Sequence, residues 1–207
     1  MLSFGLVTAA YIGSTILFIL SLGGLSNPET ARRGNWFGVA GMTIAVVATV
    51  FGPRVQTFGL PFIIVAMAAG AAIGLYAAKK VQMTQMPELV ALMHSLVGLA
   101  ACAVGFASYI DNSMTFEGAE KSIHEFEIYL GILIGAVTFS GSVIAFGKLS
   151  GKIDGKPLLL PARHWINLSG LLVVIYAGYL FLSHEGWIAM LALLVMTALA
   201  LAFGVHM

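Results

Sequence analysis

The sequence predicts an all-α integral membrane protein, a polytopic helix bundle with seven transmembrane helices. Hydrophobic residues make up 59% of the chain and charged residues 9%, whereas about a quarter of the residues of a soluble domain are charged. Seven stretches, each of about 20 residues or more, contain no Asp, Glu, Lys or Arg. Lys and Arg are concentrated in alternate connections between these stretches, which is typical of membrane proteins with a fixed orientation.

Each uncharged stretch is long enough to cross a bilayer core about 30 Å thick. The first stretch lacks the basic leader and the cleavage site of a secretory signal peptide, so we expect it to be a true span. We expect residues 1–207 to form a single transmembrane domain. In order, the stretches are Met1 to Pro28, Gly34 to Pro53, Val55 to Ala78, Leu89 to Ile110, Ile128 to Gly147, His164 to His184, and Gly186 to Met207.

Residues at the ends of the stretches support these boundaries. Pro87 suits the first turn of the fourth helix because its missing N–H would be unpaired there, and Glu88 complements the positive end of that helix. Glu88 is therefore a candidate for the point of proton access at the start of the fourth helix. The acidic connection Asp111 to Glu127 predicts a solvated face, with a short amphipathic helix around Phe116 to Phe126.

The basic residues predict the orientation of the chain. One set of alternate connections holds eight basic residues and the other set holds two, and the richer set is expected to face the cytoplasm. The N-terminus is then outside and the C-terminus is cytoplasmic. The eight are Arg32, Arg33, Lys79, Lys80, Lys148, Lys152, Lys156 and Arg163, and the two are Arg54 and Lys121.

Several function classes are disfavoured by composition and motifs. The net charge of +1 and the scattered basic residues provide no field for nucleic acid. The single cysteine, Cys102, lies inside a span and is expected to be a small packing residue, so neither an internal disulfide nor a Cys-based metal cluster is predicted. Gly147 to Lys156 lacks P-loop spacing, and no dinucleotide fingerprint follows a strand. We therefore predict no cofactor-binding or metal site in this chain.

Small residues recur at helical spacing and predict close helix packing. Gly70 and Gly74 lie four residues apart in the third span, as do Gly131 and Gly135 in the fifth. The fourth span has one predicted packing face formed by Ala91, His94, Gly98, Ala101, Cys102 and Gly105. The fifth has a similar face formed by Gly131, Gly135, Thr138, Ser142 and Ala145.

His94 is the leading candidate for a functional residue because a titratable group at membrane depth is costly unless it is used. A rise of about 1.5 Å per residue places His94 and Ser142 about 9 Å below the cytoplasmic surface. Asn167 and Ser169 are expected about 6 to 9 Å below it. The sequence thus predicts a polar layer that contributes His94, Ser142 and Asn167 to a proton path.

Other roles for His94 remain open at this point. The imidazole could instead form one structural hydrogen bond between helices, or, less readily, bind a metal or cofactor, since no second histidine lies inside another span. The remaining histidines are more typical of span ends and loops: His124, His164, His184 and His206.

The fourth span also resembles a known family. MPELVALMHSLVGLAACAVGFASYI, Met86 to Ile110, resembles the membrane domain of the beta subunit of proton-translocating NAD(P) transhydrogenase. The similarity covers essentially the whole chain. It continues through GSVIAFGKLSGKI (Gly141 to Ile153), KPLLLPARHWINL (Lys156 to Leu168) and MTALALAFGVHM (Met196 to Met207).

The resemblance implies a function that spacing alone does not provide. In that family, hydride passes between NAD(H) and NADP(H) in cytoplasmic domains while the membrane domain moves protons. His94 matches the histidine of the family's proton path, and Ser142 matches a polar residue on a neighbouring helix. The resemblance also implies a bacterial inner membrane, alpha subunits with membrane helices as partners, and a dimer of the assembled enzyme.

The family's beta subunit continues with two more membrane helices and an NADP(H)-binding domain, which this sequence does not contain. We therefore expect a membrane domain that binds neither NAD nor NADP itself, although the assembled enzyme binds both. Two alternatives from other classes are a proton-coupled carrier or channel for a small solute, and a structural membrane subunit. A carrier would transport solute on its own, whereas a structural subunit would tolerate a neutral residue at position 94.

Overall fold

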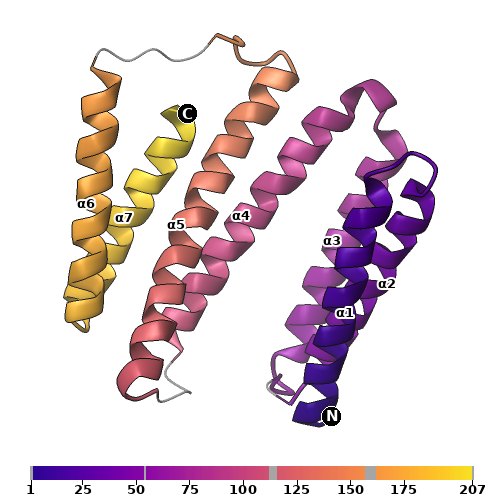
Figure 1. Cartoon of the computed structure of the whole chain (residues 1–207), viewed down its shortest axis with the longest axis horizontal. Helices are drawn as coiled ribbons and strands as arrows, with labels where there is room; N and C mark the ends of the chain where they lie inside the picture. The colour runs from indigo at the N-terminus through magenta and orange to yellow at the C-terminus, as the bar shows by residue number, and fades with distance from the viewer. Residues whose placement is uncertain (1, 54, 112–115, 157–161, 207) are drawn as a thin grey trace. The chain divides into compact units, whose positions relative to one another are not determined.

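A computed structural model describes residues 2–53, 55–111, 116–156 and 162–206 of the chain. Over these residues the protein is entirely helical and contains no strand, which confirms the predicted all-α class (Figure 1). The helices are α1 (Phe4–Leu25), α2 (Ala31–Val50), α3 (Leu60–Lys80), the short 3-10 helix η1 (Met83–Gln85), α4 (Met86–Ile110), α5 (Gly118–Leu149), α6 (Arg163–Ser183) and α7 (Trp187–His206).

Six of the described helices are long and apolar enough to cross a membrane. The chain is therefore an integral membrane protein with several spans. The exception is α2, whose first turns contain Arg32, Arg33 and Asn35. The count of seven spans and the orientation of the termini remain predictions, and Arg54, used to predict that orientation, lies outside the described residues.

One predicted boundary is wrong. The expected short helix around Phe116 to Phe126 and the expected span Ile128 to Gly147 belong to one continuous helix, α5, of 32 residues. A helix of this length extends for about 48 Å, more than the 30 Å of a bilayer core. The first turns of α5 thus carry the acidic segment beyond the apolar layer while remaining helical.

Contacts group the chain into two compact units, residues 1–80 and 81–207. The first unit is built on α1 and α2, which approach at glycines. A Cβ on Gly24 would lie 2.6 Å from the Gly34 Cα, so the two backbones are in direct contact. Gly41 faces Leu17 and the Ser14 carbonyl oxygen on the opposite helix. Small residues thus provide the packing that lipid cannot drive through the hydrophobic effect.

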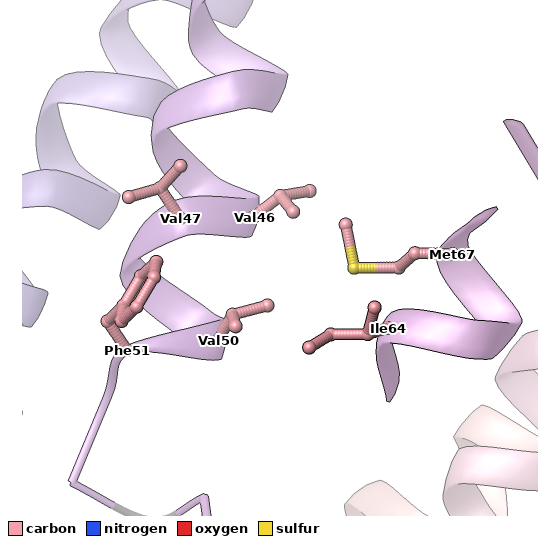
Figure 2. A pocket seen from close by; sticks show the side chains of 6 residues that line it. All are labelled: Val46, Val47, Val50, Phe51, Ile64 and Met67. Carbon is pink, nitrogen blue, oxygen red and sulfur yellow. The ribbon is translucent and has the colours of Figure 1, made fainter. Parts of the chain in front are cut away.

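The third helix of this unit packs differently. No residue of α3 is buried among the described residues, and a Cβ on Gly70 or Gly74 would meet no atom within 4 Å. A shallow apolar pocket separates α3 from α2, with Ile64 and Met67 of α3 directed toward the other helix (Figure 2). Its α2 side is formed by Val46, Val47, Val50 and Phe51. The predicted packing role of Gly70 and Gly74 therefore remains a prediction.

The second unit begins with the hairpin formed by α4 and α5. A Cβ on Gly98 would lie 2.6 Å from the Phe139 amide nitrogen, and a Cβ on Gly135 would lie 2.8 Å from the Gly98 carbonyl oxygen. The thiol of Cys102 donates a hydrogen bond to the Ile132 carbonyl oxygen at 3.3 Å. Cys102 thus packs within the hairpin.

Two further helices complete the second unit by packing on α5. The hydroxyl of Tyr129 donates a buried hydrogen bond to the Val174 carbonyl oxygen of α6 at 2.6 Å. The ring of Phe181 lies 5.7 Å from that of Tyr129 and 5.4 Å from that of Tyr109 of α4. On α7, Leu193 and Met196 are fully buried in the same core. The core therefore fixes the positions of α4, α5, α6 and α7 relative to one another along their axes.

Candidate functional site

His94 lies in the third turn of α4, and the contacts of that helix determine its level. Gly98, four residues later, packs where its Cβ would lie 2.7 Å from the Gly135 carbonyl oxygen and 2.6 Å from the Phe139 amide nitrogen. Because α4 and α5 run in opposite directions, one turn back on α4 corresponds to one turn forward on α5 (Figure 1). His94 is therefore level with the turn of α5 that contains Ser142.

Two contacts of α7 place Asn167 of α6 at the level of His94 and Ser142. Gly204 of α7 packs against α5, where its Cβ would lie 2.5 Å from the Val137 carbonyl oxygen and 2.7 Å from the Gly141 amide nitrogen. The adjacent Phe203 packs its ring on Gly170 of α6. Asn167 lies three residues from Gly170, toward the end of the unit where α4 begins and α5 ends (Figure 1).

The three candidate side chains share a level but not a bonding network. His94 and Asn167 are exposed and Ser142 is half-buried. Among the described residues, no hydrogen bond joins any two of them. Glu88, in the first turn of α4, is half-buried. Any link between these side chains must therefore come from water or from groups outside the described chain.

The predicted packing face of α4 requires a correction. The buried residues of this helix are Ser95, Gly98, Cys102 and Gly105, whereas His94 and Ala101 are exposed. Successive helical residues are about 100° apart, so His94 lies beside the contact with α5 rather than within it. Within this chain His94 thus faces outward, toward the side where a further helix or lipid would lie.

Two buried serines near this level were not predicted from the sequence. Ser95 is 1% exposed, and its hydroxyl donates to the Leu92 carbonyl oxygen at 2.7 Å. Ser140 is 7% exposed, donates to the Ala136 carbonyl oxygen at 3.0 Å and lies against Gly204. The three-four spacing of Ser95, Gly98 and Cys102 is the signal that identifies this face. Both serine hydroxyls are satisfied within their own helices.

Other predicted site residues can also be located. A Cβ on Gly131 would meet no atom within 4 Å, so its packing role remains a prediction, unlike the direct backbone contacts at Gly98 and Gly135. Over the described ranges, no group of three or more His, Cys, Asp or Glu residues is placed to hold a metal ion.

The opposite end of the second unit carries an ion-pair cluster. The ammonium of Lys121 on α5 pairs with the Glu185 carboxylate in the α6–α7 turn and lies 3.8 Å from the Glu125 carboxylate. The hydroxyl of Tyr109 donates to the Gly186 carbonyl oxygen of the same turn at 3.4 Å. The hydrogen bond and charge of Lys121 hold the pKa of Glu185 below its ordinary value. These contacts fasten the α6–α7 turn to α4 and α5.

This pair predicts a pH dependence. Because the pKa of Glu185 is lowered in the folded protein, the contribution of the pair is complete above the ordinary carboxyl pKa of about 4.3 and is lost as the pH falls through the lowered value. The thermal midpoint of Lys121→Met should lie slightly below that of the wild type at pH 7, and the difference should shrink as the pH falls below about 4.3. The effect is small because the Glu185 side chain is 80% exposed.

The control for that measurement is Lys79→Met. Lys79 ends α3, and its ammonium contacts no carboxylate among the residues that the structure describes. Its midpoint should follow the wild type at every pH. A Lys121→Met difference that stays constant from pH 7 to pH 3 would contradict the assignment.

Comparison with known proteins identifies the family. The family described as NAD(P) transhydrogenase beta subunit matches residues 7–207. Two curated relatives named NAD(P) transhydrogenase subunit beta, from Rhodospirillum rubrum and from a strain of that species, are each 46% identical over 201 residues. The alignment covers 96% of this chain but only 43% of each relative's length. The resemblance noted from the fourth span is thus confirmed, and the chain belongs to the NAD(P) transhydrogenase beta subunit family.

Proposed function

We propose that this chain is the proton-translocating membrane part of an NAD(P) transhydrogenase. It couples transmembrane proton movement to hydride transfer between NAD(H) and NADP(H), which takes place in cytoplasmic domains. One observation carries the proposal. This chain, a member of the transhydrogenase beta subunit family, has an ionisable side chain, His94, at the level of Ser142 and Asn167 within apolar helices. Ionisable residues inside membrane spans mark ion pathways because a titratable group at membrane depth is otherwise unfavourable.

In this proposal His94 exchanges a proton with water in response to the state of the nucleotide-binding domain. Imidazole suits this task because its unperturbed pKa of about 6.5 allows it to take and release a proton near neutral pH. One charge that crosses about 100 mV supplies about 2.3 kcal/mol, which shifts a coupled equilibrium by more than tenfold. The membrane potential is therefore sufficient to favour one direction of hydride transfer.

The outward position of His94 on α4 supports a route bounded by partners. In the assembled enzyme we propose that the membrane helices of the alpha subunit, or later helices of a full-length beta subunit, cover this side. The NADP-binding domain of the beta subunit would contact the basic segment that begins in the last turn of α5, which includes Lys148 and Lys152. The assembly is proposed to be a dimer in a bacterial inner membrane, with seven spans, an external N-terminus and a cytoplasmic C-terminus.

The test uses the assembled enzyme in sealed vesicles that contain a pH-sensitive dye. Hydride transfer from NADPH to an NAD analogue should change the internal pH, and a protonophore should abolish the pH change while it accelerates hydride transfer. Hydride transfer without proton movement would refute the proposal. Vesicles that hold this chain alone should show no solute flux, since such flux would instead indicate a carrier.

A further inference from the structure

His206, in the last turn of α7, holds a buried nitrogen atom that the proposed function does not use. Among the described residues, the Nδ1 atom of His206 is inaccessible to solvent and has no hydrogen-bond partner. The ring as a whole is only partly buried. No other buried side-chain nitrogen or oxygen in the described ranges lacks a partner. Buried ring nitrogens nearly always bond to protein or to water, so this atom implies a partner that is not among the described groups.

The helix contacts place His206 at the level of the proposed proton path. On α7, Gly204 packs between the Val137 carbonyl oxygen and the Gly141 amide nitrogen of α5, which runs in the same direction (Figure 1). Two residues further along, His206 is level with the turn that contains Ser142. This is also the level of His94, through the α4–α5 contacts.

The α6 side leads to the same level independently. Phe203 packs its ring on Gly170, and α6 and α7 run in opposite directions (Figure 1). Asn167 lies three residues before Gly170 on α6, and His206 lies three residues after Phe203 on α7. Because the two helices are antiparallel, Asn167 and His206 lie at the same level. Two separate contacts thus bring the imidazole of α7 to the level of polar residues on α5 and α6.

The charged groups around this position bear on the role of His206. The titratable or charged residues at this end of the two helices that pack on α7 are Lys148 of α5, and Arg163 and His164 of α6. Among the described residues of α5 and α6, no carboxylate lies near this level.

We infer that His206 is a second proton-carrying residue of this membrane domain, which takes a proton from water at Nδ1 and returns it to water on the path that His94 serves. The inference rests on the proposed function, because it assigns a further residue to the same route. It does not follow from the resemblance of the fourth span, since it depends on the register of α5, α6 and α7.

The experiment replaces His206 with asparagine in the assembled enzyme. The asparagine amide can occupy the place of Nδ1 and form a hydrogen bond there, but it does not titrate. We expect His206→Asn to lower the proton-coupled rate at least tenfold and to remove one ionisation from its pH profile. The matched control is His184→Asn, at the other end of the unit, where Nδ1 lies 3.2 Å from the Leu180 carbonyl oxygen. The control should retain the wild-type profile.

The possible outcomes distinguish a proton-carrying role of His206 from a purely structural one. Wild-type rate and profile in His206→Asn would overturn the inference, because a hydrogen bond would then suffice at this position. A lower rate with an unchanged pH profile would overturn it as well, since it would indicate only a packing defect. His94→Ala in the same assay distinguishes the two levels of the proposal: if that variant loses coupling while His206→Asn does not, only the role of His206 is wrong.

Discussion

Replacing His94 with alanine is expected to lower proton-coupled hydride transfer by about 100-fold in the assembled enzyme, the scale at which general acid–base groups contribute. The variant removes the ionisable group that the proposed route provides in α4. It should fold normally, because His94 is exposed and no described residue forms a hydrogen bond with it. The expected result is thus a loss of coupling without a loss of stability. It is measured as protons moved per hydride in vesicles, together with a thermal midpoint.

Two controls define what the His94→Ala result means. His124→Ala removes a histidine near the start of α5, where the ring packs 4.5 Å from that of Phe116, and it should leave coupling intact. His94→Asn retains hydrogen bonding without titration, so it should be as defective as alanine. Full rate and stoichiometry in His94→Asn would favour a structural subunit and contradict the proton role.

The second large effect is expected at Gly98. A Cβ at this position would lie 2.6 Å from the Phe139 amide nitrogen and 2.7 Å from the Gly135 carbonyl oxygen. Both are backbone atoms, which cannot rotate away as a flexible side chain can, so α4 and α5 must separate. We expect Gly98→Ala to destabilise the protein by about 1 to 3 kcal/mol, as overpacked cores do. Denaturant titration of the purified assembled enzyme in detergent measures this change.

The matched control for Gly98→Ala is Gly131→Ala on α5, where a Cβ would meet no atom within 4 Å. Alanine favours a helix over glycine by about 0.5 to 1 kcal/mol, so this variant should be neutral or slightly more stable. Equal stability of Gly98→Ala and the wild type would show that the two backbones are not in contact. A defect at Gly131 in the assembled enzyme would indicate a partner helix that covers this glycine.

Much of the helical organisation could be predicted from sequence because charge and length constrain it strongly. The expected first turn of the fourth helix at Pro87 agrees with α4, which begins at Met86. The extent of α5 could not be predicted. Its acidic first turns resemble a loop in hydropathy, and the continuity of a helix across a membrane surface depends on contacts such as that between Lys121 and Glu185.

The position of His94 around α4 was harder to predict for a different reason. Two adjacent stripes of small residues run along this helix, and both include Gly98 and Gly105. One passes through His94 and Ala101, and the other through Ser95 and Cys102. Spacing alone cannot choose between them, because the choice depends on which stripe meets Gly135 and Ile132 of α5.

The register that brings the candidate residues to one level required contacts between distant segments. Depths counted from the charged residues at the span ends predict a shared layer of His94, Ser142, Asn167 and Ser169. They do not include His206, whose sequence context resembles an ordinary span end. The packing roles of Gly70 and Gly74 depend on neighbours of α3 that the described chain does not provide.

The unbroken length of α5 has a mechanical consequence. A rod of 32 residues that pivots by about 5° at one tip displaces the other tip by about 4 Å. α5 contacts α4 at Gly98, α7 at Gly204 and α6 through Tyr129. These three helices must therefore move with α5 as one rigid body. A small push on the end near Lys148 is thereby carried to the opposite end of α5.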